Sequence, residues 1–470
     1  MIAPGGDGSA SNGTSPIQLK VPVGRYAQRR RRRRGNNLQN ANKKSVQEPG
    51  AAAMATALPV ARLSPQPPSK AVAPYIPRSE SEDTHLRFLI YHYVTVVNMR
   101  TLTCVGPRFE WYPLAVRDEA FFHVLMSSTS SHAAYLQKTE LPRNFFYHRG
   151  IAIQLLNERI ARGAHDEGTI NTICLFAQQE AFEGRPRTAK THIEGLLQLV
   201  RAAGGIKSVE LPEKTRRHIF FTDLAAAITL STKPILRPLL DILDFPTHFG
   251  RPSEATASYA KTFGMRLYNF SNSPLSNQAA TVMWGLRNLS QLAEDFHQGK
   301  AVLDTALASD MQFTDRVEVL ERLVHDLWYA ENQATPQHTL FRTFGWTCLI
   351  YIYTILRELP RELGMNAMLA GRIKLALESC SELNVLLATF QDLLLWQMFV
   401  CGRVADERDR PFFASQATKI LLVRKLENAD EILVAAQEFI WPERRVSMES
   451  PSNSTESSGR ADSAIMDVGE

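Results

Sequence analysis

The stretch AFEGRPRTAKTHIEGLLQLVRAAGGI, residues 181–206, indicates the fold class because its apolar residues recur with the period of an α-helix. Pro186 near its beginning and Gly204-Gly205 at its end are residues that typically start and stop a helix. One face of this predicted helix is formed by Ala189, Ile193, Leu196, Leu197 and Val200. We therefore predict an amphipathic helix that packs this face against a core.

The same helical period recurs along most of the chain, and strand-like alternation is scarce. Further apolar stripes begin at Leu86, Ile170, Val282 and Val317, and another is predicted to continue from Leu369 to Leu387. Residues 341–356 are apolar on nearly all sides, which predicts a central position. The sequence thus predicts an all-α fold, an irregular multi-helix globular domain. No repeat of fixed length is evident, which disfavours a regular solenoid.

The composition divides the chain into three parts. Residues 1–78 are rich in Gly, Ser, Asn, Ala and Pro and are predicted to be disordered. The helical body is predicted to cover residues 79–442, beginning with the capping-box spacing of Ser79 and Glu82. The Ser-rich acidic tail 443–470 is again predicted to be disordered. Within the body, the Pro, Gly, Ser and Thr residues of 245–275 predict a long connection.

With 470 residues, of which 44% are apolar, the chain can bury a sizeable core. Five unclustered cysteines, and no leader with a hydrophobic stretch before a cleavage site, predict a reducing intracellular compartment. The longest apolar runs are about half of the roughly 20 residues that a membrane span needs. We therefore predict core helices and no membrane partner.

The net charge of +5 is distributed unevenly, since residues 1–78 hold 13 basic residues against Asp7 and Glu48. This gives the N-terminal arm a charge of +11 and leaves −6 for residues 79–470. Two basic clusters with a polar spacer match a bipartite nuclear import signal, recognised by a nuclear import carrier. The candidate residues for import or phosphate contact are Arg25, Arg29, Arg30, Arg31, Arg32, Arg33, Arg34, Lys43 and Lys44.

These basic residues allow two further interpretations. They can contact DNA phosphates with salt-dependent, sequence-independent affinity, or they can form a solvated tail without a dedicated partner. Sequence-specific DNA recognition by the arm is disfavoured, because base contacts need a fixed geometry that a flexible segment lacks.

Two stretches resemble the fungal-specific transcription factor domain that follows the zinc cluster in many fungal regulators. The first is residues 181–206, with its A-x-x-H-x-x-G-L-x-x-L-V pattern and terminal Gly-Gly. The second is residues 393–442, which begins LLLWQMFVCGRVADERDRPFF and closes with EFIWPE. The resemblance implies an all-α regulatory domain, a nuclear location and no catalytic residues.

The cysteines do not fit the zinc cluster of such regulators. A binuclear cluster needs six closely spaced thiolates that begin with a C-x-x-C pair. The chain has five scattered ones, Cys104, Cys174, Cys348, Cys380 and Cys401. Either DNA contact comes through a DNA-binding partner protein or the basic arm, or an upstream exon that encodes the cluster is not included in this sequence.

The residues that carry the resemblance are interpreted as architecture. His192 is predicted to be a hydrogen-bonded histidine at a helix interface, and Gly195 to mark the close approach of another helix. Trp396 and Trp441 are predicted to be core anchors rather than stacking platforms for bases.

Motifs of enzymes are absent from the sequence: H-E-x-x-H, G-x-S-x-G, G-x-x-x-x-G-K, G-x-G-x-x-G and D-D-x-x-D do not occur. Asn288, Ser290 and Glu294 only superficially match a magnesium motif of terpene synthases. We therefore predict no catalytic, metal or cofactor residues, and no cofactor. No heptad run precedes the body, so the sequence does not indicate an oligomeric state.

The hypothesis from the sequence is a nuclear, non-enzymatic transcription regulator that acts through the transcription machinery, a partner protein or weak DNA contact. The family resemblance implies a pathway-specific regulator, including regulators of secondary-metabolite biosynthetic gene clusters. Two alternatives stay open: a zinc-cluster transcription factor whose cluster lies outside this sequence, and an all-α enzyme or scaffold of unknown substrate.

Overall fold

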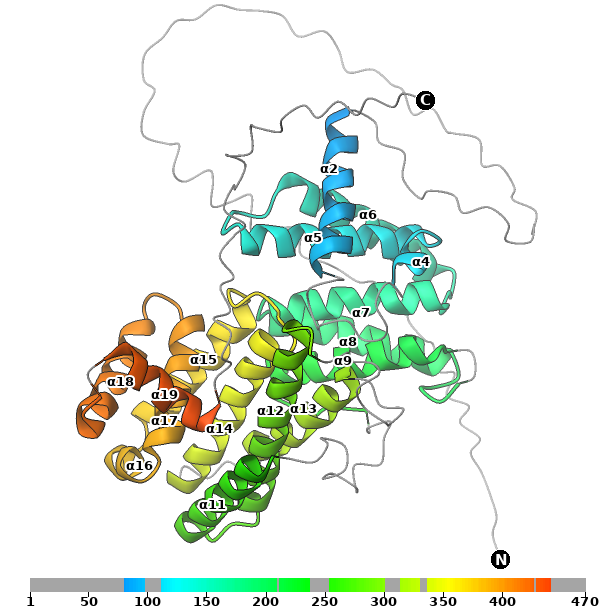
Figure 1. Cartoon of the computed structure of the whole chain (residues 1–470). Helices are drawn as coiled ribbons and strands as arrows, with labels where there is room; N and C mark the ends of the chain where they lie inside the picture. The colour runs from blue at the N-terminus through cyan, green and yellow to red at the C-terminus, as the bar shows by residue number, and fades with distance from the viewer. Residues whose placement is uncertain are drawn as a thin grey trace, which may run out of the picture. The chain divides into compact units, whose positions relative to one another are not determined.

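The computed structural model describes residues 80–97, 111–208, 211–236, 253–300, 313–329, 336–426 and 428–440, and all its regular elements there are helical (Figure 1). This confirms the predicted all-α class. The N-terminal group of helices is α2 (Glu80–His92), the π-helical turn η1 (Tyr93–Val97), α4 (Trp111–Ala115), α5 (Glu119–Leu136), α6 (Arg143–Ala161), α7 (Glu167–Phe182), α8 (Pro186–Ala202) and α9 (Glu213–Leu230).

The C-terminal group of helices follows in the chain and supplies most of the apolar core. Its elements are α11 (Glu254–Ser271), α12 (Leu275–His297), α13 (Phe313–Tyr329), α14 (Pro336–Tyr351), the π-helical turn η3 (Ile352–Leu356), α15 (Gly364–Glu378), α16 (Leu383–Thr389), α17 (Gln391–Val404), α18 (Arg410–Arg424) and α19 (Ala429–Phe439). The two groups meet where α7 contacts α15 and α9 contacts α13.

Local sequence signals explain where several helices begin and end. The Asp166 carboxylate caps α7 by accepting a hydrogen bond from the Thr169 amide at 2.9 Å. Helix α8 has Pro186 at its first position, where the missing N–H has no helical partner. Gly204 and Gly205, with φ of +86° and +90°, follow its end in the left-handed conformation that favours glycine. The start and stop signals predicted for this helix are therefore confirmed.

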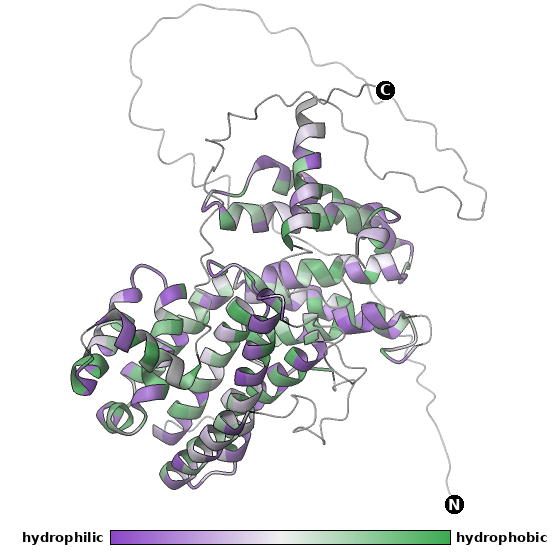
Figure 2. Cartoon of the chain, viewed as in Figure 1, coloured by the Kyte–Doolittle hydropathy of each residue, from purple (hydrophilic) through white to green (hydrophobic). Residues whose placement is uncertain are grey.

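The predicted apolar stripes are buried. All five residues of the α8 stripe are less than 9% exposed, and the stripes beginning at Ile170 and Val317 are buried as well. Figure 2 shows hydrophobic and hydrophilic residues on different sides of the same helices. Residues 341–356 form most of α14 and the whole of η3. Most of their side chains lie in the core, as predicted.

Two predictions for the helical body are wrong. Residues 245–275 were expected to form a long connection, but α11 covers Glu254–Ser271. Its Ser253 hydroxyl accepts a hydrogen bond from the Thr256 amide, so a residue that suggested a loop is the helix cap. Gly264, also taken as a break, lies inside this helix. It lies close to α12, since an added Cβ would be only 3.0 Å from the Ala280 Cβ. Small residues there allow two helices to approach closely.

The second wrong prediction is the single stripe from Leu369 to Leu387. Helix α15 ends at Glu378, and α16 begins at Leu383. Leu369, Ile373 and Leu377 are buried, whereas Leu383 and Leu387 are only half-buried. The spacing of leucines therefore continued across a turn without continuing the helix.

An aromatic cluster anchors the C-terminal group. The Trp396 ring lies 4.8 Å from that of Phe439 and 6.3 Å from that of Phe344. Phe263 packs edge-to-face on Phe344 and Phe439, with centroid distances of 5.6 Å and 5.4 Å. These contacts join α11, α14, α17 and α19, and the fully buried Trp396 confirms its predicted role as a core anchor.

Helix α14 and η3 together, Pro336–Leu356, form a helix long and apolar enough to span a membrane. Its most apolar window is 83% buried inside the protein, as expected for a core helix. The helices α16 and α17 pass the same test only as a pair, and they are bent by 109° at their junction. Burial accounts for the hydropathy of the first segment, in agreement with the predicted core helix.

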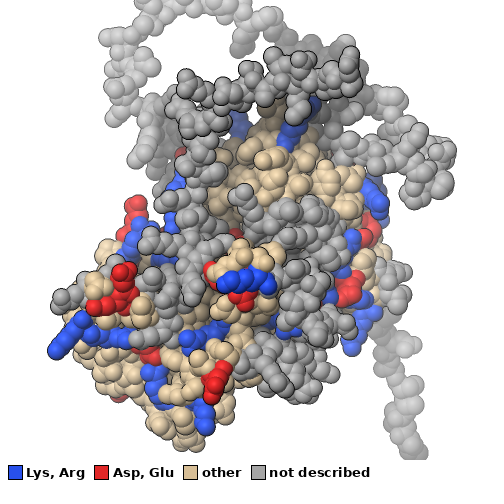
Figure 3. Space-filling view, in the orientation of Figure 1, with Lys and Arg blue, Asp and Glu red and all other residues tan. Residues whose placement is uncertain are grey.

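The basic arm 1–78, the tail 443–470, Cys104 and Trp441 lie outside the described residues. The candidate import residues, from Arg25 to Lys44, therefore have no place in the described structure. On the face drawn in Figure 3, acidic and basic side chains of the described residues are interspersed rather than segregated.

Candidate functional site

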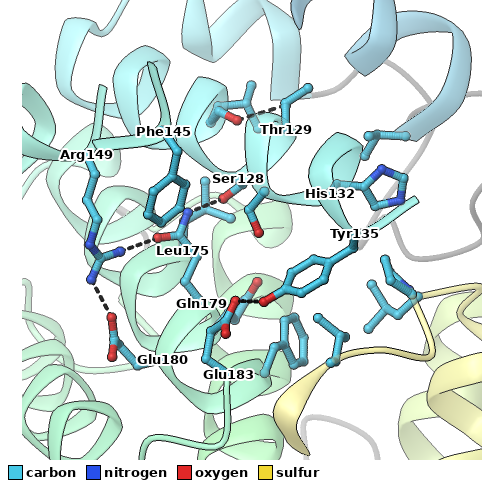
Figure 4. Close-up of a pocket in the computed structure, with 18 of the residues that line it drawn as sticks. Ser128, Thr129, His132, Tyr135, Phe145, Arg149, Leu175, Gln179, Glu180 and Glu183 are labelled. Atoms are coloured by element: carbon cyan, nitrogen blue, oxygen red, sulfur yellow. Dashed lines mark hydrogen bonds and ion pairs between the residues drawn. The ribbon is translucent and has the colours of Figure 1, made fainter. Parts of the chain in front are cut away.

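A cavity of about 190 Å³ lies among α5, α6 and α7 (Figure 4). Side chains of η1, α4 and α9 and the segment 359–363 complete its wall. A single water molecule needs only about 10–15 Å³ on this scale, so the cavity can hold an organic molecule. Its lining residues therefore form a candidate binding site.

Most of the cavity wall is apolar. Rings from five helices and one π-helical turn face it, and aliphatic side chains fill the spaces between them. The aromatic residues are Tyr93, Trp111, Phe121, Tyr135, Phe145, Phe182 and Phe221, and the aliphatic ones are Val97, Leu125, Leu175, Leu359, Pro360 and Leu363. Such a lining with a few polar groups is typical of small-molecule sites.

Arg149 organises one side of the cavity. Its Nη1 donates to the Gln179 Oε1 at 2.5 Å, and its Nη2 forms an ion pair with Glu180, which is only 2% exposed. Gln179 in turn donates to the Ser128 hydroxyl oxygen at 2.6 Å. Burial lowers the pKa of the Arg149 guanidinium, and the charge of Glu180 opposes that shift. This network fixes four polar side chains of α5, α6 and α7 relative to one another.

Glu183, in the turn that follows α7, lies on the other side of the cavity. It accepts a hydrogen bond from the Tyr135 hydroxyl, which extends across the cavity from α5 in Figure 4. Arg185 lies 3.5 Å from a Glu180 oxygen and 3.6 Å from a Glu183 oxygen. The two arginines and two glutamates of the wall therefore neutralise one another.

His132 lines the cavity on the same side as Tyr135 (Figure 4). Its Nδ1 is 3.0 Å from the Nε2 of His92, while its own Nε2 is buried without a hydrogen-bond partner. Burial, with a further contribution from the charge of His92, lowers the pKa of His132 to about 3. At neutral pH the ring is uncharged and offers one unused nitrogen.

The segment that closes the cavity from the C-terminal group is held by a close backbone approach. A Cβ added to Gly364, at the start of α15, would be only 2.4 Å from the Glu183 carbonyl oxygen. Gly184 lies opposite with a φ of +65°. This contact places Leu359, Pro360 and Leu363 against the helices of the N-terminal group.

The residues of the cavity wall can bind a ligand through apolar contacts, ring contacts and hydrogen bonds. Within the described residues, no group of three or more His, Cys, Asp or Glu side chains is arranged to hold a metal ion. Cys174, on α7, is fully buried, and burial raises the pKa of its thiol to about 12, which makes it a poor nucleophile. Ser290 and Glu294 of the superficial magnesium motif bond to the Tyr351 hydroxyl and the Gln298 amide instead.

The cavity was not found from the sequence. Its lining comes from segments up to 270 residues apart, from Tyr93 to Leu363, and none carries a recognisable ligand motif. One signal was present: Gln178, Gln179 and Glu180 interrupt the apolar helix α7, and two of these three side chains are buried. Buried polar residues require partners, and the partners of Gln179 and Glu180 include Ser128 and Arg149 of the cavity wall.

A family model described as the fungal specific transcription factor domain matches residues 88–453. The match covers more than half of the chain. The chain belongs to this family. No curated protein and no solved structure is significantly similar to it. Membership indicates a regulator of transcription rather than an enzyme, and suggests a nuclear location.

In this fungal specific transcription factor domain, the residues that carried the resemblance are structural. Gly195 of α8 lies against α7, where an added Cβ would be 3.1 Å from Ile173 Cδ1, as predicted. His192 is buried at the same interface, but it stacks on Phe176 with a centroid distance of 5.7 Å. Its Nδ1 has no hydrogen-bond partner, so the predicted hydrogen bonding is not found at that atom.

Proposed function

We propose that the protein is a nuclear, pathway-specific transcription regulator whose helical body binds a small effector in the α5–α7 cavity. Family membership over residues 88–453 is the observation that carries the regulatory role. The cavity supports effector binding, because it combines an apolar lining with an ordered polar network. A gene cluster for secondary-metabolite biosynthesis is the proposed kind of target.

The proposed route to DNA runs through a DNA-binding partner protein or the transcription machinery, with added phosphate contacts from the basic arm. Six consecutive arginines at 29–34 support such contacts and import by a nuclear carrier. The body has a formal charge of −6 over residues 79–470. This charge makes the body less suited than the arm to nonspecific DNA binding.

Chromatin immunoprecipitation with sequencing of the tagged full chain, in its native host, tests the proposal. Discrete promoter peaks, with the protein in the nucleus, are the expected result, and the peaks name the pathway. A flat profile with the protein outside the nucleus contradicts the proposal and favours an enzyme or scaffold. An untagged strain serves as the control for nonspecific precipitation.

A further inference from the structure

The charges in the cavity wall limit the kind of ligand that it accepts. Arg149 and Arg185 are paired with Glu180 and Glu183, so the described residues of the wall leave no guanidinium to receive an anionic ligand. An anion would have to break an ion pair with Glu180, whose side chain is only 3% exposed. Leaving a buried charge without its partner is strongly unfavourable. The geometry therefore excludes carboxylates and phosphates as good ligands and favours an uncharged one.

The lining also limits the ligand's shape. Seven aromatic residues face the cavity, from Tyr93 on η1 to Phe221 on α9. Aromatic side chains favour flat partners, which can stack or meet them edge-to-face. Apolar cavities of on the order of 150 Å³ take up a single aromatic ring such as benzene. A cavity of about 190 Å³ thus suits a compact molecule of one or two rings.

Two side chains supply a place for one polar group on such a ring. His132 has a buried Nε2 without a partner, and its neutral ring can donate or accept there, according to the tautomer. The Ser128 oxygen accepts from Gln179, which leaves its own O–H to donate. A hydroxyl group on the ligand can satisfy either histidine tautomer.

We propose that the cavity binds a neutral aromatic molecule of one or two rings that carries a hydroxyl group, with His132 as the residue that recognises the hydroxyl. This inference rests on the proposed role of the cavity as an effector site and names its ligand class. The ligand would contact α5–α7 on one side and Leu359, Pro360 and Leu363 on the other. Binding should therefore stabilise the contact between the two groups of helices.

Three probes that share one ring system test the proposal on the purified full chain: 2-naphthol, naphthalene and 2-naphthoate. We expect 2-naphthol to raise the thermal midpoint and to bind roughly fivefold more tightly than naphthalene, which lacks the hydrogen bond. We expect 2-naphthoate to bind about tenfold or more weakly than 2-naphthol, because its charge is not compensated. Equal or tighter binding of the carboxylate would overturn the proposal.

Two substitutions locate the probe. His132→Leu should reduce the affinity for 2-naphthol to that for naphthalene, and leave naphthalene binding unchanged. Leu175→Trp fills the cavity and should abolish the binding of both. The matched control is Leu422→Trp on α18, a side chain that is 73% exposed and should have no effect. Unaltered 2-naphthol binding in a folded Leu175→Trp variant would show that the probe binds elsewhere.

The failure of this inference can be told apart from the failure of the proposed function. The probes report only on the cavity, whereas promoter occupancy is measured without any ligand. Promoter peaks together with preferential binding of 2-naphthoate would retain the regulator and reject the neutral aromatic ligand.

Discussion

Glu321 and Arg357 form a bidentate ion pair in which neither side chain is more than 2% exposed. The Arg357 Nη2 lies 2.5 Å from one Glu321 carboxylate oxygen, and its Nε lies 3.3 Å from the other. The guanidinium also lies over the ring of Phe221, 4.3 Å from its centroid, and Phe221 lines the cavity. Burial alone would lower the pKa of Arg357, but the charge and hydrogen bonds of Glu321 outweigh burial and raise it.

We predict that Glu321→Leu destabilises the protein by about 3–5 kcal/mol, because Arg357 would remain buried without a counter-charge. The double variant Glu321→Leu with Arg357→Met should recover most of this loss, since two apolar side chains need no partner. Urea unfolding of the full chain, followed by circular dichroism, measures both effects.

The matched control for this pair is the exposed pair of Lys190 and Glu194, with side chains 64% and 57% exposed. Glu194→Ala should change the free energy of unfolding by no more than about 0.5–1 kcal/mol, because surface ion pairs contribute little. Equal effects at the buried and the exposed pair would contradict the role assigned to Glu321.

His325 of α13 makes stability depend on pH. It is 2% exposed, neither ring nitrogen has a hydrogen-bond partner, and burial lowers its pKa to about 3. The unfolded value is near 6.5, so between these values the unfolded chain binds a proton that the folded chain does not. The contribution of His325 is therefore fully present above pH 6.5 and is lost as the pH falls toward 3.

Between pH 7.5 and pH 5, the unchanged protein should lose on the order of 2 kcal/mol of stability through this linkage. The variant His325→Phe lacks the linkage and should not show this loss. At pH 7.5 the variant should be similar in stability or slightly more stable, because two buried nitrogens without partners are removed. Urea midpoints at the two pH values provide the measurement. An unchanged pH dependence would mean that His325 is not the neutral buried group described here.

The backbone approach at Gly364 predicts a strong effect of one methyl group. Gly364→Ala places a Cβ 2.4 Å from the Glu183 carbonyl oxygen, so the backbone must shift. We expect a loss of about 1–3 kcal/mol in stability. The control is Gly150→Ala within α6, where nothing lies within 4 Å of the added Cβ. That substitution should stabilise the protein by about 0.5–1 kcal/mol, because alanine favours the helix. Thermal unfolding distinguishes the two signs.

For the basic arm, we predict that replacing Arg29 to Arg34 with glutamine reduces nuclear accumulation of a fluorescently tagged chain. An import carrier recognises the positive charge of such clusters, and glutamine removes it. Replacement by lysine retains the charge and should retain nuclear accumulation. A glutamine variant that still concentrates in the nucleus would rule out the arm as the import signal.

Helices could be predicted from the sequence wherever burial on one face produced a regular stripe, as in α7 and α8. Helix α11 was missed because its stripe of Ala260, Phe263 and Leu267 lies among Ser, Thr, Asn and Gly residues, which elsewhere favour loops. Tertiary contact with α12 overrides that local preference.

The cavity could not be predicted, since its residues come together only when α5, α6 and α7 pack and residues 359–363 close over them. The Glu321–Arg357 pair is equally hidden, because 36 residues separate its members and neither lies in a motif. The basic arm 1–78 and the tail 443–470 are described only by predictions from composition.

The π-helical turn η3 determines the direction in which the next residue, Arg357, points. In it the Arg357 amide bonds to the Ile352 carbonyl five residues earlier, at 2.8 Å, so the turn holds one residue more than an α-helical turn. If the same residues formed a regular α-helix, Arg357 would be rotated by about 100° away from Glu321. Relatives that retain both residues of the buried ion pair should therefore either retain the π-helical turn or be one residue shorter at this point.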